Sequence, residues 1–266
     1  MALMTGKRGL IMGVANNHSI AWGIAKMLAD HGAELAFTYQ GDAFGKRVKP
    51  LADSVGSNLM VDCDVEDLAS VDAAFDTIKT AWGGLDFVVH AIGFSDKKEL
   101  KGLYADTSRD NFSRTMVISC FSFTEIAKRA AALMNNGGAM ITLTYGGSMR
   151  VMPNYNVMGV AKAALEASVR YLAADYGPQA IRVNALSAGP IRTLAGSGVA
   201  DARAMYNFQA RNAPLRRSVT LDDVGGAALY LLSDLSSGVT GEVHYVDAGY
   251  NITSMPVGEE MKKFEM

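Results

Sequence analysis

Seven short apolar stretches of the chain predict β-strands. Runs of this length, bounded by glycine or polar residues, are typical of strands buried in a sheet. They cover residues 7–12, 34–39, 58–61, 86–91, 139–144, 181–186 and 242–246.

Between these stretches, apolar residues recur at helical spacing. The pattern predicts helices over residues 20–28, 68–82, 108–134 and 155–176, and a further helix that begins after Thr220. Gly32 and Gly83 stand where glycine commonly ends a helix. Thr220 is suited to be an N-cap, and Asp223 then lies in the first turn, where a negative charge is favourable.

Strand and helix alternate from one end of the sequence to the other. This order predicts an α/β fold in which strands are parallel and helices cover both faces of the sheet. We therefore expect one Rossmann-like domain over residues 1–266, with a doubly wound parallel sheet of about seven strands.

Composition and charge narrow the class of protein. Hydrophobic residues make up 49% of the 266 residues and charged residues 20%, as in an ordinary soluble protein. The net charge of −2, without a long basic run, favours neither nucleic acid nor an anionic membrane surface as a partner. No apolar stretch is long enough to suggest a membrane span, and the first residues lack the apolar core of a signal peptide. The expectation is a cytoplasmic protein.

Cysteine usage agrees with this expectation. Cys63 and Cys120 are the two cysteines of the chain, and neither belongs to a C-x-x-C motif or lies near a histidine cluster. A reducing compartment is therefore favoured, and neither a disulfide framework nor a metal site is expected.

The turn after the first strand, residues 13–23, predicts a dinucleotide site with an altered fingerprint. Gly13 and Gly23 are present, but Ala15 and Ser19 replace the usual middle glycines of G-x-G-x-x-G. A pyrophosphate bound there would accept hydrogen bonds from backbone N–H groups at the positive end of a helix. Taken alone, the turn fits an ordinary strand-to-helix loop equally well, and its place at the first crossover of an α/β sheet favours the cofactor site.

The end of the second strand indicates which cofactor is used. An acidic residue there usually binds the ribose of NAD, whereas Arg or Lys accommodates the 2′-phosphate of NADP. Gln40 can bond a hydroxyl but gives a phosphate no charge, so NADH is favoured. Lys46 and Arg47 follow closely and leave NADPH open.

Two later strand ends are candidates for contacts with the adenosine. Asp64 and Val65 can reach the adenine edge, and Ile92 can lie beneath the ribose. Both segments are equally compatible with plain strand ends.

Tyr145, Tyr155 and Lys162 form the candidate catalytic group. A phenol can donate a hydrogen bond to an oxygen that becomes negative, and an ammonium can hold hydroxyls or phosphates. Each residue alone more commonly packs in a core or faces water, so the setting decides the interpretation.

The spacing of this group resembles one branch of the short-chain dehydrogenase/reductase superfamily. The common motif Tyr-x-x-x-Lys would require tyrosine at position 158, where this chain has Met158. Tyr155 instead gives Tyr-x6-Lys with Lys162, and Tyr145 lies ten residues upstream. This arrangement, together with residues 13–23, 38–40, 92–94 and 188–195, is similar to the bacterial NADH-dependent enoyl-acyl-carrier-protein reductases. The similarity extends from about Gly6 to Gly249.

The resemblance implies reduction of the trans-2 double bond of enoyl thioesters by NADH, the last reductive step of the fatty-acid elongation cycle. It implies that Tyr155 donates to the thioester oxygen, that Lys162 holds the nicotinamide ribose and that Tyr145 orients the substrate. It further implies an acyl carrier protein as partner and a homotetramer. The cofactor-binding residues that it implies are Gly13, Ser19, Ile20, Gln40, Asp64, Val65, Ile92, Lys162, Ile191, Arg192, Thr193, Leu194 and Ala195. Ser95 is placed at the substrate, at a position where many members of the family carry alanine.

The seven-residue spacing has a chemical meaning of its own. If Tyr155 is already helical, Tyr155 and Lys162 lie on nearly the same face of one helix, about 10 Å apart along its axis. They can then address one bound cofactor and substrate without touching. The wide spacing suits a neutral phenol that donates to a developing enolate, whereas a closer ammonium would depress the phenol pKa.

A lid is expected around residues 191–212. Gly196, Ser197 and Gly198 precede a helical pattern around Met205 and Tyr206, and such a segment can close over an acyl chain. The apolar slot beneath it is expected to contain Phe94, Tyr155, Met158, Ile191 and Met205. Most of the other methionines are better explained as core residues.

Two alternatives stay open at this stage. One is an alcohol-oxidising or ketone-reducing member of the wider superfamily, against which Met158 counts. The other is a dinucleotide sensor or scaffold without activity, which does not explain why Tyr145, Tyr155 and Lys162 occur together.

Overall fold

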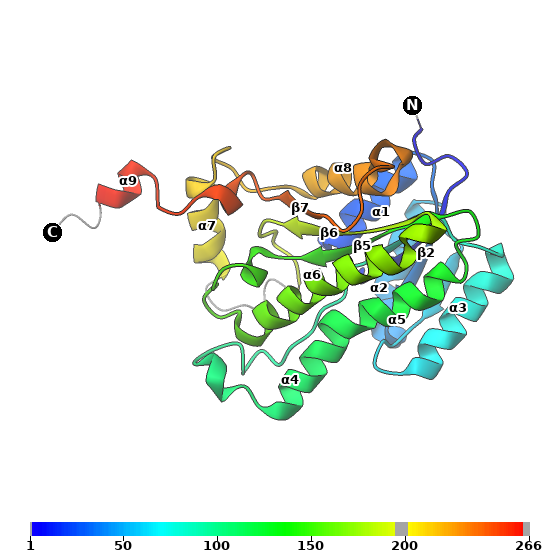
Figure 1. The fold of residues 1–266 in the computed structure, drawn as a ribbon, viewed down its shortest axis with the longest axis horizontal. Helices are drawn as coiled ribbons and strands as arrows, with labels where there is room; N and C mark the ends of the chain where they lie inside the picture. The colour runs from blue at the N-terminus through cyan, green and yellow to red at the C-terminus, as the bar shows by residue number, and fades with distance from the viewer. Residues whose placement is uncertain (1, 195–201, 263–266) are drawn as a thin grey trace.

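One parallel sheet forms the centre of the molecule (Figure 1). The computed structural model describes residues 2–194 and 202–262. In this part of the chain, seven strands are ordered β3-β2-β1-β4-β5-β6-β7, and each neighbouring pair is parallel. The strands are β1 (Arg8–Met12), β2 (Glu34–Tyr39), β3 (Leu59–Asp62), β4 (Phe87–His90), β5 (Gly138–Thr144), β6 (Ile181–Ala188) and β7 (Val243–Val246). The predicted doubly wound sheet is confirmed.

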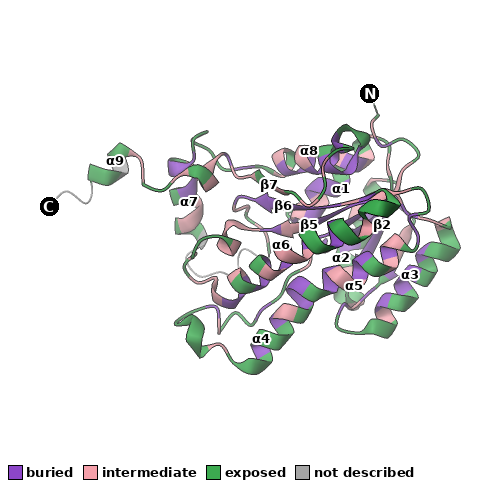
Figure 2. Ribbon diagram, in the orientation of Figure 1, coloured by how far each residue is buried: buried purple, intermediate pink, exposed green. Residues whose placement is uncertain are grey.

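Helices cover both faces of this sheet. The buried residues of α1 (Ile20–Asp30), α2 (Gly41–Ser54) and α8 (Leu221–Leu232) belong to one hydrophobic core. Those of α3 (Leu68–Trp82), α5 (Ser122–Ala131) and the part of α6 (Asn156–Tyr176) that begins at Leu165 belong to a second core on the opposite face. Val157 and Met158 of α6 pack with Leu100 in a separate small cluster. Figure 2 shows the buried residues on the strands and on the inner sides of these helices.

The strands supply both cores because successive side chains of a strand point to opposite faces. Leu10 and Met12 of β1 contribute to the second core, and Ile11 between them contributes to the first. The central strand β1 is therefore apolar from Leu10 to Met12, as is usual for a sheet that is covered on both sides.

The predicted helix ends are found where the sequence places them. Gly83 ends α3 with a positive φ of 73°, and Gly32 follows α1 with a φ of 93°. Thr220 caps α8: its hydroxyl accepts from the Asp223 N–H at 3.1 Å, and the Asp223 carboxylate accepts from the Thr220 N–H at 2.8 Å. This reciprocal pair is a capping box.

Two helical predictions need correction. The helix predicted over residues 108–134 is α4 (Arg109–Met116), a π-helical turn (Val117–Phe121) and then α5, which ends at Ala131. In the π-turn, the Ser122 hydroxyl donates to the Ile118 carbonyl at 2.7 Å. Helix α2 was not predicted from the sequence. Its segment contains Pro50 and many polar residues, and its helical pattern of apolar residues is short.

The strand order reverses between β1 and β4, which creates a crevice at the carboxyl ends of these strands. Gly13 follows β1 with a φ of 95°, and a Cβ at this position would lie 2.1 Å from the Ala91 carbonyl oxygen. Only glycine therefore fits between the two chain segments. Open α/β sheets bind their ligands at such a point.

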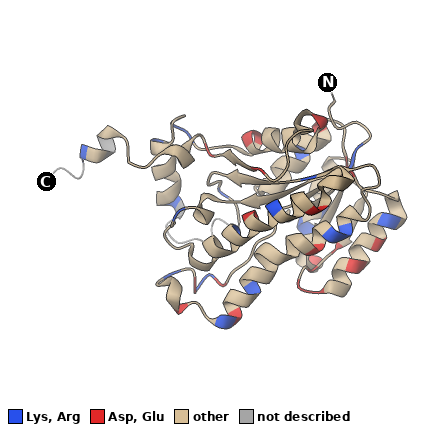
Figure 3. Cartoon of the chain, viewed as in Figure 1, with Lys and Arg blue, Asp and Glu red and all other residues tan. Residues whose placement is uncertain are grey.

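The remaining described segments lie outside the sheet and its covering helices. Helix α7 (Ala202–Asn212) packs beyond β6, and α9 (Gly258–Met261) lies on a tail that extends away from the sheet (Figure 1). Basic and acidic residues both occur along the outer helices in Figure 3. None of the helices described combines the length and apolarity required to cross a bilayer. The described residues also contain no group of three or more His, Cys, Asp or Glu side chains arranged to hold a metal ion.

Candidate active site

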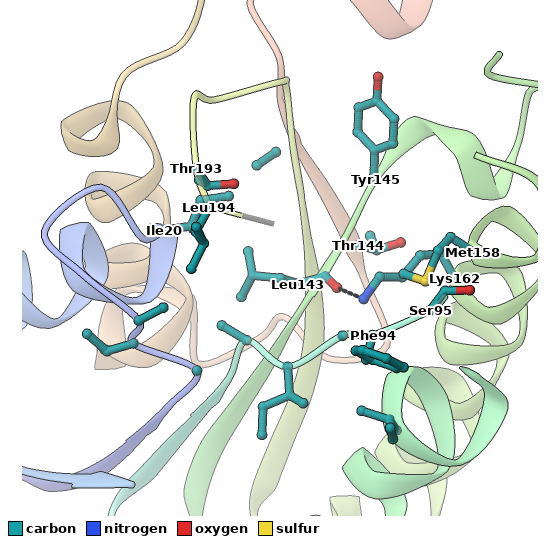
Figure 4. A pocket seen from close by; sticks show the side chains of 18 of the residues that line it. Ile20, Phe94, Ser95, Leu143, Thr144, Tyr145, Met158, Lys162, Thr193 and Leu194 are labelled. Carbon is teal, nitrogen blue, oxygen red and sulfur yellow. Dashed lines mark hydrogen bonds between the residues drawn. The ribbon is translucent and has the colours of Figure 1, made fainter. Parts of the chain in front are cut away.

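A cavity of about 720 Å³ opens at the crevice between the carboxyl ends of β1 and β4. Sixteen of the residues predicted for the site line it: Gly13, Ile20, Gln40, Asp64, Val65, Ile92, Phe94, Ser95, Tyr145, Tyr155, Met158, Lys162, Ile191, Thr193, Leu194 and Met205. Figure 4 shows Ile20, Thr193 and Leu194 on one side of the cavity and Phe94, Ser95, Met158 and Lys162 on the other. Segments far apart in the sequence thus meet around one space.

Three predicted residues do not line the cavity. Ser19 is buried under the first turn, where its hydroxyl accepts hydrogen bonds from the N–H groups of Ala15 and Asn16 at 3.0 and 3.1 Å. Arg192 is exposed and is not a lining residue. Ala195 lies outside the described residues, as do Gly196, Ser197 and Gly198 of the predicted lid. The cofactor roles of these residues stay predictions.

The turn after β1 is suited to an anion. Ser19 holds this turn in shape from below, and α1 begins directly after it with no acidic residue in its first turn. The first N–H groups of a helix have no partner within the helix, and the positive end of its dipole attracts negative charge. A pyrophosphate therefore fits at this end of the cavity.

The end of β2 is tied to the end of β3 by two aspartates. The Gln40 amide donates to the Asp64 carboxylate at 2.9 Å, and the Gly41 N–H donates to Asp62 at 2.9 Å. The guanidinium of Arg47 lies against the Phe44 ring, 5.9 Å from its centroid, and neither Lys46 nor Arg47 lines the cavity. Two carboxylates, Asp62 and Asp64, therefore lie at the ends of β2 and β3, and of the two only Asp64 lines the cavity.

The segment after β4 is held by the π-turn. Ser119 accepts a hydrogen bond from the Phe94 N–H at 2.9 Å and donates one to the Phe94 carbonyl at 2.9 Å. Ser95 is buried, and its hydroxyl accepts from Thr115 at 3.0 Å and from the Asn111 amide at 3.2 Å. The sequence gives no signal for these partners, because α4 and the π-turn are distant in the chain from the segment they hold.

An ion pair closes the outer wall of the cavity. Arg114 of α4 donates two hydrogen bonds to Glu66, each 2.8 Å long, and its guanidinium lies 4.5 Å from the centroid of the Phe94 ring. The bidentate geometry fixes the guanidinium plane. The ion pair connects α4 to the segment that follows β3.

Lys162 projects from α6 into the centre of the site. Its ammonium donates to the Leu143 carbonyl at 2.8 Å, as the dashed line in Figure 4 marks. Only 7% of the residue is exposed, and burial lowers its pKa to about 8. Lys162 therefore lies where an ammonium can contact a bound ligand and where its charge is sensitive to its surroundings.

The two tyrosines contact each other edge to face. The ring centroids of Tyr145 and Tyr155 are 5.2 Å apart, with an angle of 73° between the planes. Burial raises the pKa of Tyr145 to about 12 and raises the pKa of Tyr155 further. Both phenols are therefore neutral near pH 7 and available as hydrogen-bond donors.

Gly147 makes this arrangement possible. A Cβ at position 147 would lie 2.4 Å from Cδ1 of Tyr155, so a larger residue would displace the ring. Tyr155 itself precedes the helix: α6 begins at Asn156, whose φ is 35°. The expectation that Tyr155 is already helical is therefore wrong, and the turn before α6 sets its position relative to Lys162.

The segment after β6 continues the wall toward α7. Tyr206 donates to the Ile191 carbonyl at 3.2 Å, and Met205 lines the cavity beside it. Helix α7 thus begins over the apolar part of the site, where the helical part of the lid was expected.

The chain is similar to known proteins over nearly its whole length. Residues 13–251 match the model of a family described as enoyl-(acyl carrier protein) reductase. The enoyl-acyl-carrier-protein reductase (NADH) 2 of Rhizobium meliloti is 78% identical over 260 residues, which are 98% of this chain and 97% of the relative.

Two solved structures have the same fold. The crystal structure of FabI from Candidatus Liberibacter asiaticus has a TM-score of 0.94 and 64% identity, and the match covers 96% of this chain and 98% of that one. The enoyl-acyl-carrier-protein reductase from Anaplasma phagocytophilum in complex with NAD has a TM-score of 0.93 and 60% identity, with 96% and 97% covered.

Proposed function

The chain belongs to the enoyl-(acyl carrier protein) reductase family, and we propose that it reduces the trans-2 double bond of enoyl thioesters with NADH. This reaction is the last reductive step of the fatty-acid elongation cycle. The observation that supports it best is a buried ammonium and two neutral phenols on one wall of a nucleotide-sized cavity, with Met158 at the position that a carbonyl-reducing relative gives to tyrosine.

The cavity fits a nicotinamide dinucleotide. The turn at Gly13 and the start of α1 suit the pyrophosphate, and Gln40 with Asp64 suits an adenosine ribose without a 2′-phosphate. When bound, NADH supplies the hydride that the β-carbon of the enoyl thioester accepts. The α-carbon of the resulting enolate must also take a proton, which comes from a phenol or from water, and the side chains around the cavity stabilise the enolate until it does.

Tyr155 stabilises the charge that develops on the substrate. As the β-carbon gains a hydride, negative charge moves to the thioester oxygen, and a donor placed there lowers the barrier. The phenol of Tyr155 is neutral and half-buried, so it can donate without first losing a water shell. Tyr145, whose ring lies edge to face with that of Tyr155, orients the thioester.

Lys162 holds the ribose hydroxyls of the nicotinamide. Its ammonium has three donors, of which one is directed to the Leu143 carbonyl. The others are available to hydroxyl oxygens in the cavity. We infer that this contact sets the distance between the nicotinamide and the substrate.

An apolar slot receives the acyl chain. Phe94, Met158, Ile191 and Met205 line the cavity near the tyrosines, and methionine side chains adapt to chains of different length. The segment at residues 191–212 then acts as the lid that excludes water from the reacting atoms.

The natural substrate is an enoyl thioester carried by acyl carrier protein, as the activity implies. We further propose that the protein works as a homotetramer in the cytoplasm. Size-exclusion chromatography with light scattering tests the tetramer.

An assay with a trans-2-enoyl thioester and NADH tests the function directly. Loss of NADH absorbance that depends on the double bond is expected, and a saturated thioester is the control. Reduction of a ketone instead would support the carbonyl-reducing alternative. NADH binding without turnover of any thioester would support a sensor or scaffold.

A further inference from the structure

Glu166 is a buried carboxylate to which the proposed reaction assigns no role. It lies on α6 and is 4% exposed. Its Oε1 accepts a hydrogen bond of 2.6 Å from the Thr144 hydroxyl, which is also buried. A bond this short to an ionised oxygen is of the strong, charge-assisted kind.

Glu166 and Lys162 both form hydrogen bonds with the end of β5. Glu166 lies one helical turn after Lys162, so the two side chains leave the same face of α6. Lys162 donates to the carbonyl of Leu143, and Glu166 accepts from Thr144. Two opposite charges of α6 therefore hold consecutive residues at the end of β5, directly before Tyr145.

Titratable groups from several elements lie near Lys162. Cys120 of the π-turn and Glu166 both oppose the effect of burial on the Lys162 pKa. Burial raises the pKa of the Cys120 thiol, and burial with the nearby Lys162 charge lowers the pKa of His90 on β4 to about 3. Burial also raises the pKa of Tyr155, so near pH 7 these three groups are neutral.

We propose that Glu166 is a positioning residue, which keeps Lys162 in its ammonium form and fixes the end of β5 that carries Tyr145. The Lys162 ammonium has little contact with water, and the negative charge of the Glu166 carboxylate stabilises it. The hydrogen bond to Thr144 holds the carboxylate in place. This inference rests on the proposed role of Lys162 in holding the nicotinamide ribose.

The sign of the pH effect follows from the Lys162 titration. Removal of the Glu166 charge lowers the Lys162 pKa, so the ammonium is lost at a lower pH. If the ammonium is the form that binds NADH, the Kd should begin to rise at a lower pH in the variant. At low pH, both proteins have a charged lysine and should bind alike.

The test is a fluorescence titration of NADH binding between about pH 6 and pH 9 with wild type and Glu166→Gln. Glutamine keeps the size and a hydrogen-bonding oxygen for Thr144. A fall of one unit in the Lys162 pKa would weaken NADH binding about tenfold near pH 9 and less than about twofold near pH 6. Asp175→Asn, at an exposed position on the same helix, is the matched control and should follow the wild-type profile.

Two further variants separate the possible failures. Lys162→Ala should weaken binding and remove the pH dependence; unchanged affinity would overturn the proposed role of Lys162 and this inference with it. If the pH midpoint of the rise in the Kd for NADH were the same in Glu166→Gln as in wild type, while Lys162→Ala bound NADH more weakly, the role of Glu166 alone would be overturned. Glu166→Asp keeps the charge and should keep the midpoint, so a fall by a pH unit in that variant would also contradict the proposal.

Discussion

At the scale of single residues, Tyr155 and Tyr145 should differ in what their hydroxyls contribute. Tyr155→Phe keeps the ring and removes the donor to the developing oxyanion. Because that interaction strengthens only as charge develops, kcat should fall with KM little changed. Loss of one such donor typically costs about 10²–10³ in rate. Tyr145→Phe should be milder in steady-state assays, since Tyr145 only orients the substrate.

This comparison requires that both variants fold and bind NADH with near wild-type affinity. The edge-to-face contact of the rings survives in both, because phenylalanine keeps the aromatic edge and face. If Tyr145→Phe lost more in kcat than Tyr155→Phe, Tyr145 would be the residue that stabilises the developing oxyanion, and the assignment here would be reversed.

Cofactor choice is a second property of single residues. Gln40 donates to Asp64, and this carboxylate would repel a 2′-phosphate placed beside it. We expect a clearly higher kcat/KM with NADH than with NADPH. Asp64→Asn should reduce the ratio of kcat/KM with NADH to kcat/KM with NADPH, because the variant no longer repels the 2′-phosphate. A wild-type preference for NADPH would mean that Lys46 or Arg47 reaches the phosphate.

At this scale, the sequence identifies residues that belong to a local motif, and their roles stay predictions. Tyr145, Tyr155, Met158 and Lys162 lie within eighteen positions of one another, and the structure brings them to one cavity. Partners such as Glu166, Ser119 and Arg114 could not be found this way. Their contacts join positions 22, 25 and 48 residues apart, and spacing along the chain says nothing of such pairs.

At the scale of elements, the π-turn should be needed for the substrate end of the cavity. Ser119→Ala removes both hydrogen bonds to the Phe94 backbone and leaves a donor and an acceptor without that partner. An unsatisfied group of this kind costs about 1–3 kcal/mol. We expect a fall of several degrees in Tm and a raised KM for the enoyl thioester, with a smaller change for NADH.

Ser113→Ala, on the exposed side of α4, is the matched control and should leave both quantities unchanged. Equal effects of Ser119→Ala on the two KM values would indicate that the π-turn supports the fold in general and not the Phe94 segment in particular.

The elements themselves were mostly predictable, because strands buried on both faces are apolar throughout and helix ends carry recognisable residues. Gly83 and the Thr220–Asp223 pair are examples. The π-turn was not predictable, since residues 117–121 carry the same apolar spacing that a regular helix would show. The hydrogen bonds of Ser119 to the Phe94 backbone accompany this turn and join it to a segment that is distant in the sequence.

At the scale of the whole molecule, His90 should contribute to acid unfolding. The residue is fully buried, its Nδ1 lies 3.0 Å from the Thr142 hydroxyl and its Nε2 lies 2.9 Å from the Ser122 hydroxyl. Its pKa is lowered from 6.5 to about 3, mainly by burial. The folded state therefore stays unprotonated at a pH where the unfolded state binds a proton.

The sign of the effect follows from this difference. Above pH 6.5 the contribution of His90 to the free energy of unfolding is constant. It is lost as the pH falls toward about 3, at about 1.4 kcal/mol per pH unit. Urea unfolding between about pH 6.5 and 4.5 should show a shallower decline in His90→Asn. His18→Asn, at an exposed loop position, serves as control. If the free energy of unfolding fell with decreasing pH at the same slope in His90→Asn and in wild type, His90 would not contribute to acid unfolding.

The parallel sheet with helices on both faces followed from the alternation of strands and helices along the sequence. What could not be predicted is which side chains of the helices contribute to the cavity. Arg114 of α4, paired with Glu66, and Lys162 of α6, bonded to the Leu143 carbonyl, both line it.

The buried lysine also makes the site chemically reactive. An ordinary lysine has a pKa near 10.4 and is almost wholly protonated near pH 8, whereas about half of Lys162 would be a free amine at that pH. A desolvated amine is a nucleophile. A small apolar acylating reagent should therefore modify Lys162 before exposed lysines, and bound NADH should protect it. Peptide mapping by mass spectrometry would measure both, and covalent inhibitors aimed at this amine would have a defined anchoring atom.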